Sequence, residues 1–292
     1  MSSENYSKYA NLKVLDFYKE LPFNYYSDPK KQMESVKNGK ANIKANGPLE
    51  EEIIQANTIL DAGCGPGWLS NSISYLYSNK KVTALDFNPI AVERAKEVAS
   101  NMNLKTNFIV DDLFNYKPTE KFDLVMSIGV LMCTNDCSEA IRSLIKNTLK
   151  SGGSLYIGLY HQYGRPPFLD HFKKLSDKGF SENELLEEYS KIHSTIKDKT
   201  HIRSWFRDQV LHPHETLHSI EEMITLLDDM GLKVTHTSIN RFEPIKFENN
   251  NYDQDQLKKI YELEKNMEND SKKALEDRRY YPGFFTFLAK EI

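Results

Sequence analysis

Residues 58–67 read Thr-Ile-Leu-Asp-Ala-Gly-Cys-Gly-Pro-Gly, and this stretch restricts the fold of the chain more than any other. Its apolar start predicts a short buried strand, and glycines follow at positions 63, 65 and 67. The apolar spacing of Trp68–Tyr77 then predicts a helix. Glycine lets the backbone turn tightly and lets a ligand approach the main chain, while the helix N-terminus offers unpaired N–H groups. The segment therefore predicts a nucleotide-binding turn.

Strands and helices alternate beyond this turn. Strands are expected over residues 58–61, 81–86, 107–110, 122–128, 154–160, 233–239 and 283–288. Helices are expected over residues 68–77, 89–102, 139–149 and 219–230. Nearly continuous apolar strands separated by amphipathic helices are typical of a parallel sheet covered on both faces. The predicted fold class is therefore α/β, a Rossmann-like seven-stranded, mostly parallel sheet with helices on both faces.

Three polar and aromatic regions interrupt or precede this alternation. Residues 1–50 contain one expected helix, Tyr9–Leu21, and are interpreted as a lid, although a helix packed on the core would give the same pattern. Within a main domain at 51–292 we expect a cap insertion at about 164–215, with a helix over Asn183–Ile196. A smaller helical insertion is expected at about 244–280, with a helix near Gln256–Met267.

Composition excludes several classes of function. The 38 basic and 42 acidic residues give a net charge of -4, so no nucleic-acid partner is expected. Because no apolar run approaches the roughly 20 residues of a membrane span, no membrane partner is expected either. The chain has three cysteines and no signal peptide at its start, which favours a cytoplasmic protein.

Acidic residues end the first three predicted strands. Asp61 precedes the glycines, where a carboxylate would repel a pyrophosphate but would suit an ammonium group. Asp86 is positioned to accept hydrogen bonds from ribose hydroxyls. Asp112 is positioned for the exocyclic amine of adenine, with Phe87 and Leu113 as apolar neighbours of the ring. The acids favour S-adenosylmethionine (SAM), which carries an amino acid and no phosphate, over a nicotinamide dinucleotide.

With these residues in place, the sequence resembles the class I SAM-dependent methyltransferases, specifically a bacterial type with an inserted cap. The matching segments are Ile59–Gly67, Ala84–Pro89, Asp112-Leu113 and Phe122–Val125. The resemblance implies an antiparallel final strand and SAM as cofactor. It implies that Asp61 and the glycines hold the methionine part. The expected cofactor-binding residues are Asp61, Ala62, Gly63, Gly65, Gly67, Asp86, Phe87, Asp112, Leu113 and Ser127.

Catalytic candidates lie after the fifth predicted strand and in the cap. Many small-molecule methyltransferases carry a histidine pair after the fourth strand, but this chain has Met132 and Cys133 there. A base is therefore sought in the clusters at 159–167 and 204–216. The proposed catalytic residues are His161, Tyr160, His214 and Asp208. The proposed substrate-binding residues are Arg165, Arg207 and His212.

Each candidate also has a structural explanation. His161 can be a buried, satisfied histidine, and Arg207 can pair with Asp208 or with a neighbouring acid in the cap. His212 and His214 could share a metal ion, but the sequence specifies no third ligand, so no metal is expected. The segment 278–283 is interpreted as an exposed basic turn, with a pocket rim as its alternative.

The predicted function is methyl transfer from SAM to an O or N atom of a small or medium polar acceptor, such as a sugar or another metabolite, in an enclosed site. A non-catalytic SAM-binding regulator is one alternative, because the histidine pair is missing. A nicotinamide-dependent oxidoreductase is disfavoured by Asp61, and an RNA methyltransferase is disfavoured by the net negative charge.

Overall fold

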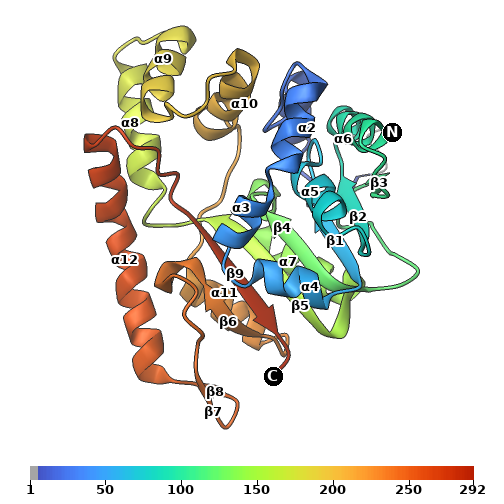
Figure 1. Ribbon diagram of the computed structural model, residues 1–292. Coiled ribbons are helices and arrows are strands. Elements are labelled where there is room, and N and C mark those ends of the chain that lie inside the picture. Colours follow the sequence, from blue (N-terminus) through green and yellow to red (C-terminus); the bar gives the residue numbers. More distant parts are fainter. Residues whose placement is uncertain (1–5) are drawn as a thin grey trace.

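A seven-stranded sheet forms the centre of the computed structural model, which describes residues 6–292 (Figure 1). The strands lie in the order β3-β2-β1-β4-β5-β9-β6. Their bounds are β1 Thr58–Ala62, β2 Lys81–Asp86, β3 Asn107–Val110, β4 Phe122–Ile128, β5 Leu149–Tyr160, β6 Lys233–Thr237 and β9 Phe284–Lys290. Neighbours from β3 to β5 pair in parallel, whereas β9 pairs antiparallel with both β5 and β6. The predicted fold class and the antiparallel final strand are both confirmed.

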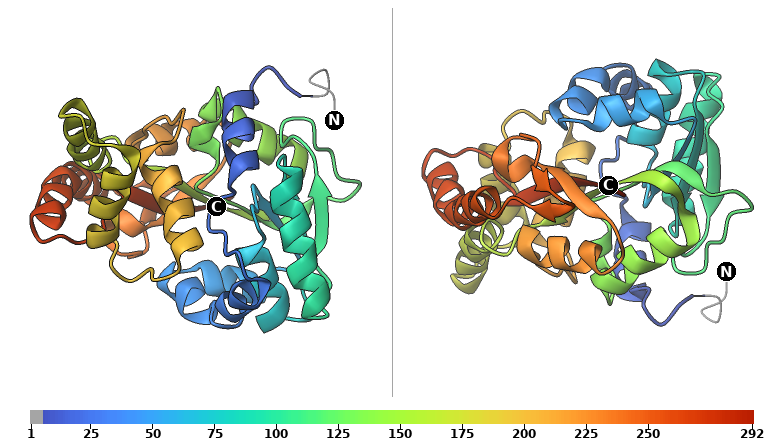
Figure 2. Two further views of the ribbon diagram at one scale, coloured as in Figure 1. Left: turned by 90° about the horizontal axis from the view of Figure 1, so that it is seen from above. Right: turned by 90° about the horizontal axis from the view of Figure 1, so that it is seen from below.

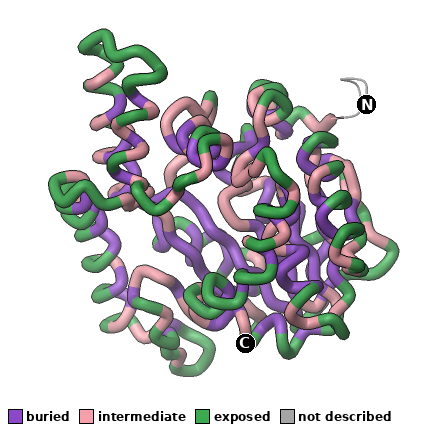
Figure 3. Tube along the Cα trace, turned by 45° about the horizontal axis from the view of Figure 1, so that its top comes forward, coloured by how far each residue is buried: buried purple, intermediate pink, exposed green. Residues whose placement is uncertain are grey.

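Helices cover both faces of the sheet (Figure 2). On one face lie α5 (Trp68–Leu76) and α6 (Pro89–Asn101), and on the other lie α7 (Cys137–Thr148) and α11 (Ile220–Asp228). Two short 3-10 helices follow strands, η2 at Leu131–Cys133 and η3 at Ser238–Asn240. The strands run through the most buried part of the molecule (Figure 3). Burial on both faces explains why β4 is almost continuously apolar in sequence.

Residues 6–55 form four helices, whereas periodicity predicted a single helix in the first 50 residues. They are α1 Leu12–Glu20, α2 Pro29–Lys37, α3 Lys40–Ala45 and α4 Leu49–Gln55. The Asp28 side chain caps α2, and Pro29, whose φ is fixed by its ring, is the first residue of the helix. The sequence therefore contained a signal for the start of this helix. Residues 1–5 of the predicted lid lie outside the described part of the chain.

The cap insertion also contains more helix than predicted. Three helices replace the single one expected: α8 Pro166–Asp177, α9 Glu182–Ile192 and α10 Lys199–Val210. They share a separate apolar cluster built on Phe168, Tyr189 and Phe206, which are fully buried. The cap stands beyond the carboxyl ends of the parallel strands, at the top of Figure 1.

The second insertion consists of a small hairpin and a long helix. The hairpin joins β7 (Phe247–Glu248) to β8 (Asn251–Tyr252), and α12 extends over Gln254–Glu276. Charged residues recur along α12, and its core side carries Leu257, Ile260 and Met267. Within residues 6–292, no helix combines the length and the apolar character needed to cross a membrane.

Candidate functional site

The three glycines after β1 have different structural tasks. All three have positive φ, which side chains rarely adopt. A Cβ on Gly63 would lie 2.4 Å from Val130 Cγ2, and one on Gly67 would lie 2.6 Å from the Cβ of Ala95. A Cβ on Gly65 would meet nothing within 4 Å. Close packing therefore requires two of the glycines, while Gly65 leaves open space for a ligand.

A cavity of about 350 Å³ lies beside this turn, at the carboxyl ends of the central strands. Its sheet side is formed by the ends of β1, β2, β3 and β4. What we call its roof is formed by the N-terminal residues, the cap, the end of β5 and the segment that leads into β9. The sheet side includes Gly63, Gly65, Asp86, Phe87, Asp112, Leu113, Ile128 and Gly129. The roof includes Ala10, Val14, Tyr18, Phe23, Tyr160, Trp205, Asp208, Gln209, Tyr280 and Phe284. This is the location expected for a ligand of an open α/β sheet.

Asp86 joins the end of β2 to the glycine turn. Its Oδ2 accepts a hydrogen bond from the N–H of Gly65 at 2.7 Å, and its Oδ1 accepts one from the N–H of Asn88 at 2.8 Å. Because each carboxylate oxygen can accept a second bond, the group can still receive ribose hydroxyls. Burial raises the pKa of Asp86 to about 6.

Asp112 lies on the cavity wall and is contacted by the N-terminal segment. Its Oδ2 accepts a hydrogen bond from the N–H of Ser7 at 2.7 Å, and its Oδ1 accepts one from the N–H of Phe114 at 3.1 Å. Leu113 and Phe114 line the cavity next to it. A carboxylate flanked by apolar side chains fits an adenine, which is flat and apolar with an exocyclic amine at its edge.

Four of the predicted cofactor-binding residues do not line the cavity: Asp61, Ala62, Gly67 and Ser127. Asp61 is 4% exposed and its Oδ2 accepts a hydrogen bond from the Ser70 hydroxyl, while burial raises its pKa to about 6. The Ser127 hydroxyl donates to the carbonyl of Ala62 at 2.8 Å, and both residues are fully buried. Their contacts hold the glycine turn and join β1 to β4.

The residues that do face the cavity fit SAM. Open space at Gly65, acceptor groups at the ends of β2 and β3, and the apolar Phe87 match a nucleoside without phosphate. The cavity lining contains no lysine or arginine among the described residues, the side chains that commonly hold phosphate groups.

A hydrogen-bonded cluster around Asp208 lies on the roof of the cavity. The Tyr18 hydroxyl donates to Oδ1 of Asp208, and the Tyr160 hydroxyl lies 3.5 Å from Oδ2. The side-chain amide of Gln209 donates to the Tyr160 oxygen at 2.6 Å and also to Oδ2 of Asp208. Burial raises the pKa of Asp208 despite these donors. The cluster unites α1, β5 and α10 around one carboxylate.

Comparison with known proteins agrees with this geometry. The sequence profile of a family described as "Methyltransferase domain" matches residues 54–266. The chain belongs to the class I SAM-dependent methyltransferases. SAM is therefore its cofactor, and the alternative of a nicotinamide-dependent oxidoreductase is wrong.

Two curated relatives come from Ilyobacter polytropus. Malonyl-[acyl-carrier protein] O-methyltransferase 1 is 34% identical over 119 residues, which cover 40% of this chain and 42% of the relative. Malonyl-[acyl-carrier protein] O-methyltransferase 2 is 24% identical over 217 residues, covering 72% and 78%. Among solved structures, magnesium protoporphyrin IX methyltransferase from Synechocystis with bound SAH is 14% identical with a TM-score of 0.51. The match covers 97% of this chain and 96% of that structure, and it shows a shared fold.

In this methyltransferase, Arg165 is engaged entirely by the protein. It is fully buried, and its Nε and Nη2 donate to the two oxygens of Glu215 at 2.8 and 2.9 Å. Its guanidinium also donates to the side chain and the carbonyl of Gln209 and lies 3.9 Å from the centre of the Tyr160 ring. Arg165 therefore supports the cluster from behind and does not line the cavity.

The other predicted substrate residues join the cap to α1. Arg207 donates to the carbonyl of Phe17 at 3.2 Å and to Glu20 at 2.7 Å. His212 packs edge-on against the ring of Phe17, and burial lowers its pKa to about 4. Neither residue lines the cavity. Among the residues that the structure describes, no three acids, histidines or cysteines come together as metal ligands.

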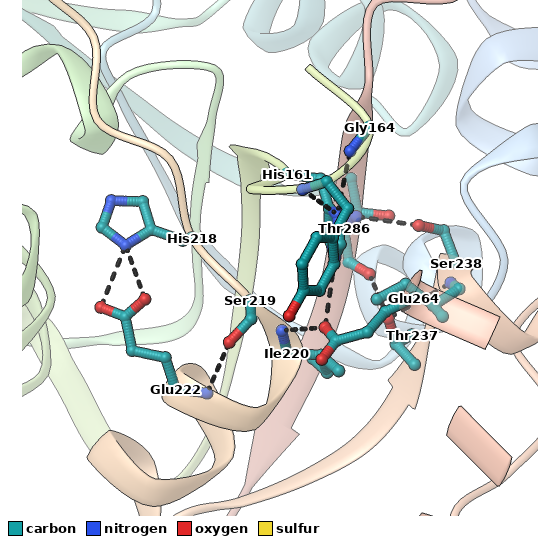
Figure 4. Close-up of polar contacts among 12 residues, drawn as sticks. His161, Gly164, His218, Ser219, Ile220, Glu222, Thr237, Ser238, Glu264 and Thr286 are labelled. Atoms are coloured by element: carbon teal, nitrogen blue, oxygen red, sulfur yellow. Dashed lines mark hydrogen bonds and ion pairs between the residues drawn. The ribbon is translucent and has the colours of Figure 1, made fainter. Parts of the chain in front are cut away.

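The two histidines proposed as bases also lie away from the cavity lining. His161 is fully buried, and its Nε2 lies 3.1 Å from Oε2 of Glu264, which also accepts the N–H of Ile220 (Figure 4). His161 therefore anchors α12 to the end of β5, the buried, satisfied alternative foreseen for it. His214 Nε2 lies 3.0 Å from the carbonyl of Thr134. Of the four catalytic candidates, the structure brings together Tyr160 and Asp208 on the cavity wall.

Several cavity residues were missed from the sequence. Tyr18 belonged to a recognised amphipathic helix, but its periodicity did not distinguish a core contact from a ligand contact. Tyr280 and Pro282 line the cavity, so the segment 278–283 contributes to the pocket rim, which was the less favoured interpretation. Trp205 and Gln209 flank the predicted Asp208 at helical spacing and could have been included with it.

Proposed function

We propose that this enzyme transfers a methyl group from SAM to an O or N atom of a small acceptor enclosed between the sheet and the cap. The observation that carries the proposal is the position of Asp208, whose carboxylate lies on the same cavity as Gly65, Asp86 and Asp112. Bound SAM supplies a methyl group on a positively charged sulfur. The chain itself must orient the acceptor, exclude water and take up a proton.

Asp208 is the proposed proton acceptor. A hydroxyl or protonated amine must lose a proton to become a nucleophile, and a carboxylate with a raised pKa is a stronger base than an exposed one. Tyr18 and Tyr160 donate to Asp208 and fix its orientation, while Arg165 holds Gln209 from behind. This arrangement positions the base through residues on three separate elements.

The N-terminal region is proposed as a lid over both ligands. Asn135 donates its side-chain amide to the carbonyls of Lys8 and Ala10 at 3.1 Å each, and Asn88 donates to the carbonyl of Tyr18 at 3.0 Å. Farther along, Asn24 Oδ1 lies 2.7 Å from Nε2 of His201 in the cap. These contacts connect the N-terminal segment to the loops that follow β2 and β4 and to α10, which supports a closed site that excludes water.

The experiment has two stages. Calorimetry with SAM, S-adenosylhomocysteine (SAH) and NAD tests the cofactor, and SAH release tests transfer to a panel of small alcohols, phenols and amines. SAM and SAH are expected to bind and NAD is not, with SAH release above the rate without acceptor for at least one member. Binding of SAM without SAH release for any small acceptor, but with release for a malonyl-carrier protein, would move the acceptor to the class named for the two relatives.

A further inference from the structure

The roof of the cavity carries a buried negative charge without a free positive partner. Asp208 is 9% exposed, and the described residues lining the cavity include no lysine, arginine or histidine. The hydrogen bonds to Asp208 come from uncharged groups, the hydroxyls of Tyr18 and Tyr160 and the amide of Gln209. A buried carboxylate that is hydrogen-bonded only by uncharged groups is costly, and a cationic ligand would offset this cost.

Arg165 acts on Asp208 through its charge and lowers the pKa of Asp208, but its guanidinium hydrogen-bonds to Glu215 and Gln209. Both oxygens of Glu215 accept hydrogen bonds from its guanidinium, so this pair is neutral as a unit. With Asp208 ionised, the three groups together carry one net negative charge. Asp208 carries that charge and lines the cavity.

Aromatic rings surround the same part of the cavity. Tyr18, Trp205, Tyr280 and Phe284 line it together with Tyr160. One face of the Tyr160 ring is covered by the Arg165 guanidinium, and one face of the Tyr280 ring is covered by the stacked ring of His193. The faces of aromatic rings attract cations, and the attraction is strongest where water is excluded.

We propose that the methyl acceptor is an amine that enters as an ammonium ion and is held by Asp208 within these rings. This inference rests on the proposed function, because it names the acceptor class of the same cavity. After binding, one N–H proton passes to a carboxylate oxygen of Asp208, and the nitrogen keeps the electron pair of that bond. This pair forms the new N–C bond to the methyl group as the methyl–sulfur bond breaks, and the sulfur keeps the electrons of the broken bond in the leaving SAH. Burial raises the pKa of Asp208, which makes this proton transfer easier than to an exposed carboxylate.

The test compares choline with its uncharged carbon isostere, 3,3-dimethylbutan-1-ol, as ligands of the SAH-loaded enzyme. Both are measured by calorimetry against the native protein, Asp208→Asn and Asp170→Asn. Asp170 is an exposed acid on α8 in the same cap and serves as the matched control. Turnover is followed in parallel as SAH release with 2-phenylethylamine, 2-phenylethanol and 3-phenylpropanoate.

Choline is expected to bind about ten-fold more tightly than the alcohol, the difference that a cation–π and charge contact of this kind provides. Asp208→Asn should remove that preference, and Asp170→Asn should keep it. Among the turnover probes, the amine should release the most SAH.

Equal or undetectable binding of the two isosteres would overturn the inference, and the native protein alone suffices for that comparison. A loss of SAH affinity in Asp208→Asn would also overturn it, because the carboxylate would then serve the cofactor. If SAM binds and 2-phenylethanol is methylated while choline shows no preference, the proposed function stands and the amine assignment fails. If SAM itself does not bind, the proposed function fails.

Discussion

The two sides of the cavity are built on different principles. On the sheet side, main-chain groups and carboxylates at strand ends meet the ligand, and their positions follow from the order of strands in the sequence. On the cap side, Tyr18, Tyr160 and Asp208 meet although they lie up to 190 positions apart in the sequence. The sheet side is fixed by local backbone geometry, whereas the cap side depends on side chains that meet only after folding.

The difference extends to how each side is stabilised. Gly63 and Gly67 act through steric limits on the backbone, which are local. The cap depends on a buried ion pair and a network of side-chain hydrogen bonds, which fail together when one member is removed. We therefore expect substitutions in the cap to have larger and more widespread effects on stability than substitutions in the glycine turn.

The largest effect is expected at Arg165. Arg165→Met leaves Glu215 and Gln209 without their buried partner and should lower the free energy of unfolding by about 3–5 kcal/mol. Chemical denaturation measures the loss. The double variant with Glu215→Gln should recover part of it, because no uncompensated charge remains. A loss below about 1 kcal/mol, the range of an exposed pair, would contradict a structural role for Arg165.

A smaller loss of stability is expected at His161. His161→Phe removes the contact with Glu264 and should cost about 1.5–3 kcal/mol, the usual range for a hydrogen bond to a charged group. Turnover at a temperature where the variant is folded should equal that of the native enzyme. If turnover instead fell about 100-fold while SAM affinity stayed the same, His161 would again be a candidate base.

Gly67 is expected to serve packing and Gly65 to serve ligand access, so substitutions at the two positions should have different effects. Gly67→Ala should destabilise the protein by more than about 1 kcal/mol, because a strained φ is combined with a contact to Ala95. Gly65→Ala carries the backbone strain alone but places a methyl group in open space beside the cavity. Its expected signature is weaker binding of SAH, measured by calorimetry. Equal SAH affinity in both variants would remove Gly65 from the cofactor site.

The smallest effect concerns pH. Burial raises the pKa of Asp86 to about 6, so protonation of Asp86 increases the free energy of unfolding of the protein without SAH. That contribution is complete below the ordinary value of 3.8 and is lost as pH rises through about 6. SAH hydroxyls favour the ionised form, so SAH should bind up to about ten-fold more tightly at pH 7.5 than at pH 5. Calorimetry across this range checks the slope, which Asp86→Asn should reduce. Tighter binding at pH 5 would contradict the assignment.

Sequence alone predicted the sheet side well. The glycine spacing and the acids at strand ends are local signals, and Asp86 and Asp112 lie on the cavity as expected. Asp61 and Ser127 belong to the same region, but they lie one layer behind the wall. A strand pattern predicts which residues are near a turn and does not predict which of them face the ligand.

The cap side was predicted only in part. Asp208 and Tyr160 were selected for their chemistry and position, whereas Arg165 and His161 looked equally suitable in sequence. Their partners, Glu215 and Glu264, lie 50 and 103 residues away, and only the folded structure shows that these partners saturate them. Whether a polar residue is free or satisfied is a property of tertiary contacts.

The most direct test of the account pairs Asp86→Asn with Asp208→Asn and measures both SAH affinity and turnover with the best acceptor. If the two sides of the cavity have separate tasks, Asp86→Asn weakens SAH binding. Asp208→Asn should then leave the SAH dissociation constant unchanged and lower kcat by about 100-fold or more, the usual contribution of a general base. Loss of SAH affinity in Asp208→Asn, or native turnover in that variant, would contradict the division between cofactor side and acceptor side.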